Sequence, residues 1–430
     1  MTNLAWNVER VLPSAIADLH RLISIPSISS MPEHDADVAA CADAVSGLFR
    51  DLGASEVKLL DGGGKPAVWA NFLGPEGSPT VLLYAHYDVQ PTGDADAWTS
   101  PAFEPTERDG RLYARGSADD KGGVALHVAA LRVFDGKPPV GVKVFIEGEE
   151  EVGSPSMPTL LDRYRDELAA DVYVVADSVN WEVGKPSLTT SLRGVADCQV
   201  TVSTLAEGLH SGQFGGVVPD ALTALCRLLA TLHDDAGNVA IEGLVTGTAP
   251  DLDYPEDRLL EETGLLEGVS QIGDGSVVER MWFKPAASVL AIDATPVAKA
   301  SNTLIPSARA KVSVRLVPGQ DPAAAAKALE EHLRRNAPWG AHVDVVAGQC
   351  GAPGRITLEG ERAEAAKTAF REAFGVDAVE IGCGGSIPIV AEFADRNPGA
   401  LVLVTAVTDP NSRMHGIDES LDLGDFAKAA

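Results

Sequence analysis

The sequence predicts an α/β fold into which a smaller α+β domain is inserted. Helical and strand patterns alternate over the first 190 residues or so, and strands such as VLLYA and VKVFI are nearly continuous apolar runs. Such strands are typical of a sheet that is covered on both faces. Further along, the order β-α-β-β-α-β favours a small α+β domain with helices on one face of its sheet. The first pattern then returns, so we expect one domain to interrupt the other.

The predicted domain boundaries follow from these patterns. The first domain comprises residues 1–190 and 356–430, and the inserted domain comprises residues 191–355. In the first domain we expect helices at 7–23, 37–52, 122–134, 158–168 and 359–374, and strands at 79–85, 111–114, 142–146, 171–176 and 400–407. In the inserted domain we expect strands at 195–203, 288–293, 308–317 and 341–348, and helices at 219–233 and 321–336.

Composition narrows the classes of function. Of the 430 residues, 45% are hydrophobic and 22% are charged, and the formal net charge at pH 7 is −28. A surface this acidic repels nucleic acid and anionic membranes, so we expect neither as a partner. The five cysteines include no C-x-x-C pair, which argues against a disulfide framework and against a thiolate zinc site. Without a signal-peptide pattern or a membrane-spanning apolar run, a soluble cytoplasmic protein is expected.

Residues that can bind a metal ion follow several of the predicted strands. They are His86 and Asp88 in HYDVQP, Asp119 and Asp120 in RGSADDKGG, Glu147, Glu149, Glu150 and Glu151 in FIEGEEEVGS, Asp177 in VVADS, and His415 in MHGIDES. The carboxyl ends of strands form the ligand-binding edge of an open α/β sheet. Alone, each residue has an ordinary alternative role, as a solvated histidine, a helix cap or a solvent-exposed glutamate. Together they indicate one site, because clustered carboxylates repel each other unless a cation lies among them.

These motifs, in this order, resemble those of the M20 metallopeptidase family. The branch that they resemble is that of carnosinase and Cys-Gly dipeptidase, and LHSGQFGG, RLVPGQDP and GCGGSIP are also similar to that branch. The resemblance runs from near the N-terminus to the end of the chain. It implies a zinc-exopeptidase-like catalytic domain with a mixed sheet, and it implies that the inserted domain is a lid and dimerisation domain.

The resemblance also implies a set of metal ligands. They are His86, Asp119, Glu151, Asp177 and His415, with Asp119 bridging two divalent ions. Zn²⁺ suits the mixed imidazole and carboxylate ligands, and Mn²⁺ or Co²⁺ is an alternative. Glu150 would be the general base, and Asp88 would orient His86. The family further implies a cis peptide after Asp119, whereas Glu147 and Glu149 receive no catalytic role and are expected to support the site or to be exposed.

The inserted domain is expected to bind the substrate. His210 in LHSGQFGG resembles a family histidine that polarises the scissile carbonyl in the other subunit of a homodimer. Arg315, with Thr303 and Ser386, resembles the group that binds the C-terminal carboxylate of the substrate. The alternatives are a salt bridge for Arg315 and a turn for Thr303. Two departures from the family pattern, Met414 and Asp418, flank the expected ligand His415.

The resulting functional hypothesis is a di-metal hydrolase that cleaves dipeptides or short peptides with a free C-terminal carboxylate. Within the same family, an N-acyl-amino-acid deacylase or desuccinylase is the principal alternative, and a carboxypeptidase is a further variant. A catalytically silent dimeric binding module is an alternative of another class. Against this alternative, Glu150 and all five residues of the implied ligand set are present.

Overall fold

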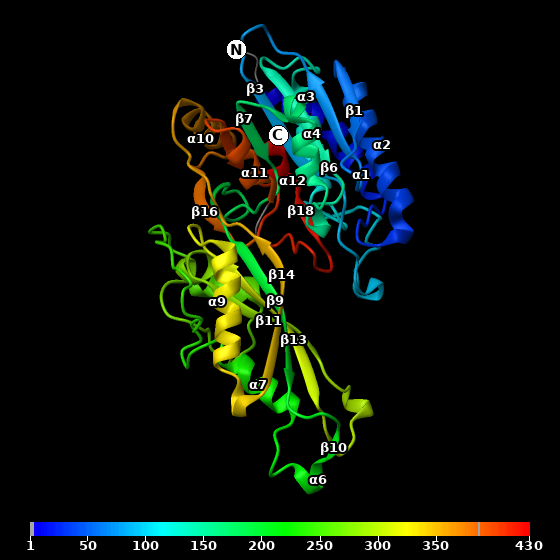
Figure 1. Ribbon diagram of the computed structural model, residues 1–430. Coiled ribbons are helices and arrows are strands. Elements are labelled where there is room, and N and C mark those ends of the chain that lie inside the picture. Colours follow the sequence, from blue (N-terminus) through cyan, green and yellow to red (C-terminus); the bar gives the residue numbers. More distant parts are fainter. Residues whose placement is uncertain (1–3, 386–387) are drawn as a thin grey trace. The chain divides into compact units, whose positions relative to one another are not determined.

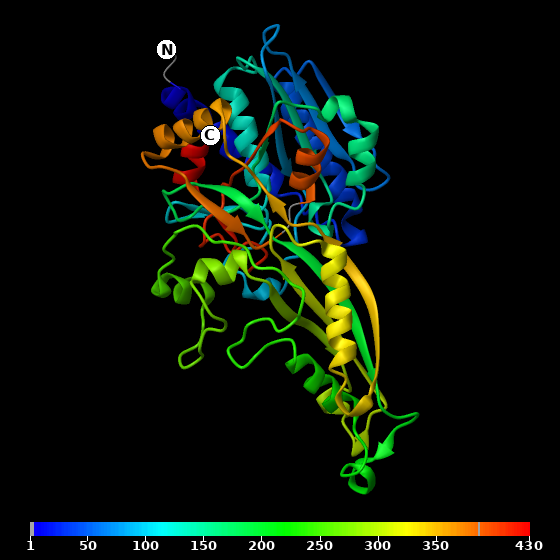
Figure 2. The same ribbon diagram turned by 60° about the vertical axis from the view of Figure 1, so that its left-hand side comes forward.

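The chain forms two units, which are described separately. The computed structural model describes residues 4–385 and 388–430. Unit 1 comprises Met1–Thr190, Ile356–Ile381 and Pro388–Ala430, and unit 2 comprises Ser191–Arg355 and Gly382–Ile387. Figures 1 and 2 show both units from two directions.

A six-stranded mixed sheet forms the centre of unit 1. Its strand order is β1-β2-β6-β3-β7-β17, in which β6, β3, β7 and β17 run parallel and β1 and β2 join at one edge through antiparallel pairs. The strands are β1 (Glu56–Leu60), β2 (Ala67–Phe72), β3 (Thr80–His86), β6 (Gly141–Glu147), β7 (Val172–Val175) and β17 (Leu401–Val404). The helices are α1 (Leu4–Ile23), α2 (Asp35–Asp51), α3 (Lys121–Val133), α4 (Met157–Arg163), α5 (Arg165–Leu168), α10 (Glu361–Phe374), α11 (Pro388–Arg396) and α12 (Leu423–Ala429).

Both faces of this sheet are buried. Val144 and Ile146 of β6 pack in a core with residues of α2 and α3. Phe145, between them, points to the opposite face, where its ring lies 6.1 Å from that of Tyr84. This alternation explains why the consecutive residues Val144, Phe145 and Ile146 are all apolar. The predicted mixed α/β fold is confirmed by these observations and by the solved structures reported below.

Two further small sheets contain the remaining strands of unit 1. One of these sheets also includes residues that belong to unit 2. One has the order β18-β5-β4, from β4 (Thr106–Arg108), β5 (Arg111–Tyr113) and β18 (Ser420–Asp422). The other has the order β15-β8-β16, from β8 (Ser187–Leu192), β15 (Gly354–Arg355) and β16 (Val379–Cys383). The strand expected at 111–114 is therefore β5, which belongs to a separate sheet and not to the central one.

A four-stranded antiparallel sheet forms unit 2, with helices packed on one face. The strand order is β11-β13-β9-β14. The elements are β9 (Gly194–Ser203), β10 (Leu209–His210), α6 (Ser211–Phe214), α7 (Ala221–Ala230), α8 (Glu256–Thr263), β11 (Ala286–Asp293), β12 (Thr303–Leu304), β13 (Ser307–Leu316), α9 (Pro322–Arg335) and β14 (His342–Gly351). Helix α9 runs along the sheet in both views (Figures 1 and 2). Alternate residues of β13 are buried in a core that includes residues of α7 and α9.

Several local predictions were wrong or incomplete. The single helix expected at 158–168 is broken at Tyr164, whose backbone is not helical (φ −117°, ψ 36°), so that α4 and α5 are separate. Strands β1 and β2 were not predicted, because they are short runs that contain polar residues between glycine-rich turns. In the part of the chain that the structure describes, no helix combines the length and the apolar character that crossing a bilayer requires.

Candidate metal centre

The carboxyl edge of the central sheet carries most of the predicted ligands. His86 is the last residue of β3 and lies in register with Glu147, the last residue of β6. Asp177 follows β7 by two residues. Asp119 comes from elsewhere, because it lies in the turn that leads into α3. Parallel strands that end at one edge thus bring residues distant in sequence together.

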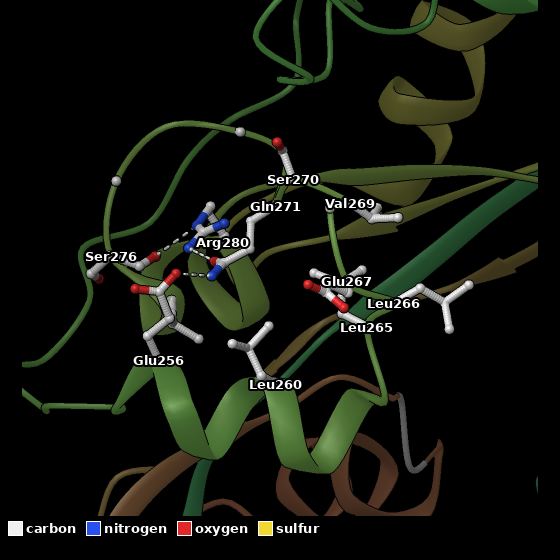
Figure 3. Close-up of a pocket in the computed structure, with 14 residues that line it drawn as sticks. Glu256, Leu260, Leu265, Leu266, Glu267, Val269, Ser270, Gln271, Ser276 and Arg280 are labelled. Atoms are coloured by element: carbon white, nitrogen blue, oxygen red, sulfur yellow. Dashed lines mark hydrogen bonds between the residues drawn. The ribbon is translucent and has the colours of Figure 1, made fainter.

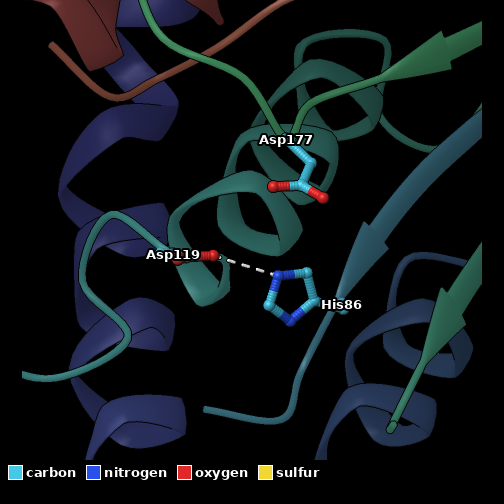
Figure 4. A group of neighbouring side chains, drawn as sticks. All are labelled: His86, Asp119 and Asp177. Atoms are coloured by element: carbon cyan, nitrogen blue, oxygen red, sulfur yellow. Dashed lines mark hydrogen bonds and ion pairs between the residues drawn. The ribbon is translucent and has the colours of Figure 1, made fainter. Parts of the chain in front are cut away.

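Three of these side chains form a first group. His86, Asp119 and Asp177 each offer a ligand atom, and these atoms lie within 4.8 Å of one another. His86 Nε2 is 3.0 Å from Asp119 Oδ1, and Figure 4 shows all three side chains pointing toward one another. Among residues 4–385 and 388–430, none donates a hydrogen bond to the Asp177 carboxylate. A partly buried carboxylate without a donor, beside imidazole and a second carboxylate, fits a divalent cation.

A second group shares Asp119 with the first. Its members are Asp119, Glu151 and His415, again with ligand atoms within 4.8 Å. His415 Nε2 lies 3.1 Å from Asp119 Oδ2 and 3.2 Å from Glu151 Oε2. The two oxygens of Asp119 therefore face different histidines, as expected of a carboxylate that bridges two cations. The peptide between Asp119 and Asp120 is cis, as predicted.

The charges in this cluster interact strongly. Burial acts to raise the pKa of Asp119, but hydrogen bonds from His415 and His86 outweigh it and lower that pKa. The hydrogen bonds that His415 makes with Asp119 and Glu151 raise its pKa to about 10. Burial raises the pKa of Asp177 well above its ordinary value. Positive charge is therefore favoured beside these carboxylates, which is consistent with two cations bound by this donor set.

The loop after β6 places Glu150 beside the ligand Glu151. The Asp88 carboxylate accepts hydrogen bonds from the backbone N–H of Glu150 at 3.2 Å and of Glu151 at 3.1 Å. Asp88 also lies against His86, since His86 Nδ1 is 3.1 Å from the Asp88 carbonyl oxygen and 3.4 Å from its carboxylate. One aspartate thus touches both the histidine and the glutamate loop. Burial raises the pKa of Glu150 to about 7.

One supporting residue, Gln90, was not recognised in the sequence, and another, Asp120, has a contact that was not predicted. Gln90 donates hydrogen bonds to both carboxylate oxygens of Glu151, from its backbone N–H at 3.1 Å and from Nε2 at 2.8 Å. Asp120 caps α3 by accepting from Gly123 N and also accepts from His86 N at 3.2 Å. The cap was considered as an alternative role for this aspartate, but its second bond to His86 joins elements that are distant in sequence.

Glu147 and Glu149 are buried rather than exposed. Glu147 accepts hydrogen bonds from the hydroxyl groups of Tyr84 at 2.5 Å and Ser154 at 2.8 Å, and burial raises its pKa to about 8. Glu149 accepts from the backbone N–H groups of Lys65 at 2.9 Å and Ser156 at 2.7 Å. Both glutamates therefore hold the loop that carries Glu150 and Glu151.

The two departures from the family pattern leave His415 in place. Asp418 accepts hydrogen bonds from Thr99 N at 2.9 Å and Thr99 Oγ1 at 2.6 Å, so its carboxylate anchors the loop. Met414 is 41% exposed. His415 has a left-handed backbone (φ 61°), a conformation that places its imidazole against Asp119 and Glu151.

The predicted substrate-binding residues that the structure describes all belong to unit 2. His210 and Thr303 lie opposite each other in the pair of β10 and β12. His210 Nδ1 accepts a hydrogen bond from Gly212 N at 3.1 Å, which leaves the ring proton on Nε2. Arg315 is an exposed residue of β13. Ser386 lies outside the described residues.

Unit 2 also contains a pocket of about 780 Å³ (Figure 3). It is lined by residues of α8 and the following loop, including Leu260, Leu266 and Arg280. Arg280 donates a hydrogen bond to Gln271 Oε1 at 2.7 Å across this pocket. None of the predicted ligands or substrate-binding residues lines it, so it is not part of the candidate site.

Comparison with known proteins identifies the family. Residues 82–430 match the pattern of "Peptidase family M20/M25/M40". A cysteinylglycine-S-conjugate dipeptidase of Corynebacterium striatum is 36% identical over 433 residues, covering 98% of this chain and 93% of that protein. A Beta-Ala-His dipeptidase of Rattus norvegicus is 30% identical over 416 residues, covering 89% and 83%. The solved structure of the dipeptidase Dug1p from Saccharomyces cerevisiae has a TM-score of 0.86 at 25% identity and covers 100% and 96%. The predicted resemblance is thereby confirmed, and the chain belongs to the M20 family of peptidases.

Proposed function

We propose that this enzyme is a metal-dependent dipeptidase with two divalent cations in its active site. The observation that carries the proposal is the pair of three-residue groups that share Asp119. Each group has three protein ligands, which leaves a position for water or substrate, as in catalytic rather than structural zinc sites. The dipeptidases named above are similar over most of their length, and this supports the substrate class.

The donor set assigns one group of ligands to each cation. His86 and Asp177 would hold one, Glu151 and His415 the other, and Asp119 would touch both. Bound there, two divalent cations would supply Lewis-acid polarisation and lower the pKa of water. Zn²⁺ is proposed because two imidazoles and three carboxylates suit it, and Mn²⁺ or Co²⁺ suits the same ligands.

Glu150 would move the proton in this reaction. It takes a proton from the water that attacks the scissile carbonyl carbon, and it delivers a proton to the nitrogen of the leaving amine. Burial raises the pKa of Glu150 above its ordinary value, which favours uptake of a proton by this carboxylate. Asp88 supports this role by holding the backbone of Glu150, which fixes where the base stands relative to the ligand Glu151.

His210 would stabilise the negative charge that develops on the carbonyl oxygen. Because His210 Nδ1 accepts a hydrogen bond from Gly212 N, the ring proton lies on Nε2, and this N–H can donate to the carbonyl oxygen. The resemblance assigns this histidine to the active site of a second copy, so the proposal includes a homodimer formed through unit 2. Its edge strand β11 supports this, because Val289, Leu290 and Ile292 are 42%, 59% and 45% exposed, and exposed edges favour pairing.

The substrate's C-terminal carboxylate would bind Arg315, with Thr303 and Ser386 beside it. Arg315 makes no ion pair with any residue that the structure describes, and a guanidinium can bind a carboxylate through two parallel hydrogen bonds. A cytoplasmic location is also proposed. The five free cysteines, two of them exposed, suit a reducing compartment.

The test compares a dipeptide that has a free amino terminus with the N-acetylated form of its C-terminal amino acid. Each is incubated with the purified protein and Zn²⁺, and released amino acid is measured. Cleavage of the dipeptide alone supports the proposal. Cleavage of the acetylated compound alone would instead establish the deacylase alternative, and binding of metal without turnover of either would support the silent binding module.

A further inference from the structure

Arg115 and Glu419 form an ion pair inside unit 1, next to the candidate metal centre. The side chains are 1% and 0% exposed, and Arg115 Nη1 lies 2.6 Å from Glu419 Oε2. The two residues are 304 positions apart in the sequence. Ion pairs this deeply buried are weak evidence for stability, because desolvation of both charges offsets much of their attraction. Their other contacts indicate a more specific role.

The second oxygen of Glu419 holds the backbone at Asp119. Glu419 Oε1 accepts hydrogen bonds from the N–H groups of Ala118 and Asp119, both at 3.0 Å. Asp119 is the residue common to both groups of candidate ligands. A fixed carboxylate behind its amide restricts how the Asp119 side chain can approach the two histidines.

Arg115 joins two further segments through Nη2. This nitrogen donates to the carbonyl oxygens of Pro91 at 3.1 Å and Gly416 at 3.2 Å. Pro91 ends the segment that begins with His86, and Gly416 follows His415 directly. Arg115 lies under the ring of Trp98, 5.5 Å from its centroid, which shields the guanidinium from water.

We propose that the Arg115–Glu419 pair is a positioning element that sets the relative placement of three ligand-bearing segments, those of His86, Asp119 and His415. Neither residue touches a cation or the substrate, so both act through the ligands. The inference rests on the proposed di-metal function. It predicts that the pair determines metal affinity separately from its effect on the stability of the fold.

A neighbouring ion pair provides a matched control. Arg111 lies on the same stretch of chain, and its Nη2 is 2.8 Å from Asp409 Oδ2, with side chains 12% and 1% exposed. Arg111 also donates to Ser420 Oγ at 2.8 Å and Ser420 O at 3.0 Å. This pair holds the segment that carries His415, and Arg111 Nη1 also lies 3.8 Å from Asp422 Oδ2, but neither side chain accepts a hydrogen bond from the backbone amide of a predicted ligand.

The experiment measures zinc affinity, thermal unfolding and turnover in four variants. They are Arg115→Met, Glu419→Gln, the double variant with both changes, and Asp409→Asn. Zinc dissociation constants and stoichiometry are obtained by competition with a chromophoric chelator, and unfolding is followed with and without zinc. Each single change at the pair leaves a buried charge unpaired, so both are expected to lower the melting temperature and to weaken zinc binding by ~10–100-fold.

The double variant and the control distinguish positioning from stability. Removing both charges should restore the melting temperature of the metal-free protein while zinc affinity stays reduced, because Pro91 and Gly416 still lack their donor. Asp409→Asn should lower the melting temperature and leave zinc affinity unchanged. Recovery of affinity together with stability, or an equal loss of affinity in Asp409→Asn, would overturn the inference. If the unaltered protein binds none of Zn²⁺, Mn²⁺ and Co²⁺, the proposed function fails and the inference with it, whereas equal zinc binding in all variants refutes the inference alone.

Discussion

Replacing Glu147 with glutamine should make the protein more stable at alkaline pH and leave its stability near pH 5 almost unchanged. Glu147 is 1% exposed, and burial raises its pKa from 4.5 to about 8. Between these values the folded protein holds the proton and the unfolded chain does not. Stability therefore falls as pH rises through this window, because ionising a buried carboxyl costs free energy that the exposed group does not incur.

The size of the effect follows from the shift. At pH 7.5, three pH units above the ordinary pKa of 4.5, keeping Glu147 protonated lowers the free energy of unfolding by about 4 kcal/mol. This figure uses about 1.4 kcal/mol for each pH unit. Glutamine has the shape of the protonated acid, and its amide can accept from Tyr84 while donating to Ser154. It should therefore lack the pH-dependent cost while keeping both hydrogen bonds.

Urea unfolding of both proteins at half-unit steps from pH 5 to pH 8 measures this difference. Subtracting one free energy of unfolding from the other cancels contributions common to both, including those of bound metal. The exposed Glu76 on unit 1 provides a control, since Glu76→Gln should give a flat difference. A flat difference for Glu147→Gln as well, or a glutamine variant that loses stability as pH rises, would refute the reasoning.

Four other expectations concern the site and the core. Glu150→Ala should retain both metals while kcat falls by ~10²–10⁴-fold, whereas Glu151→Ala should lose one metal; equal metal content in the two variants would contradict these roles. Removing metal with a chelator should abolish turnover and lower the melting temperature, with recovery on adding Zn²⁺. Arg315→Met should raise KM for dipeptides by ~10–100-fold through loss of a charge-assisted bond, measured from initial rates. Phe393→Ala should destabilise the fold by ~3–5 kcal/mol in urea, because its ring stacks on Tyr173 at 4.1 Å.

Most of the candidate site could be predicted from the sequence, because its residues follow strands with a clear apolar pattern. His86, Glu151 and Asp177 each come directly or shortly after such a strand, and parallel strands must bring their ends together. Asp119 was also expected to follow a strand of the same sheet, but the strand before it, β5, belongs to another sheet, so for this residue the strand argument was wrong and only the motif supports the prediction.

What the sequence could not predict depends on contacts between distant segments. Glu419 lies 300 residues from the amide of Asp119 that it holds, and no local pattern indicates that pairing. The acidic run shows the same limitation. Glu147 and Glu149 resemble exposed glutamates in sequence, yet hydroxyl and amide donors from the loop and from β3 surround them. The two glutamates are buried because the loop after β6 folds back over them, and the local sequence does not predict this fold.

The two ends of unit 1 that flank residues 191–355 meet each other. Ile356 N donates a hydrogen bond to Thr190 O at 2.9 Å, and just beyond them Ser191 pairs with Arg355. Loop closure between these points therefore costs little whatever lies between them. In evolutionary terms, this junction is a place where a whole domain can be gained, exchanged or lost without breaking a strand of the central sheet.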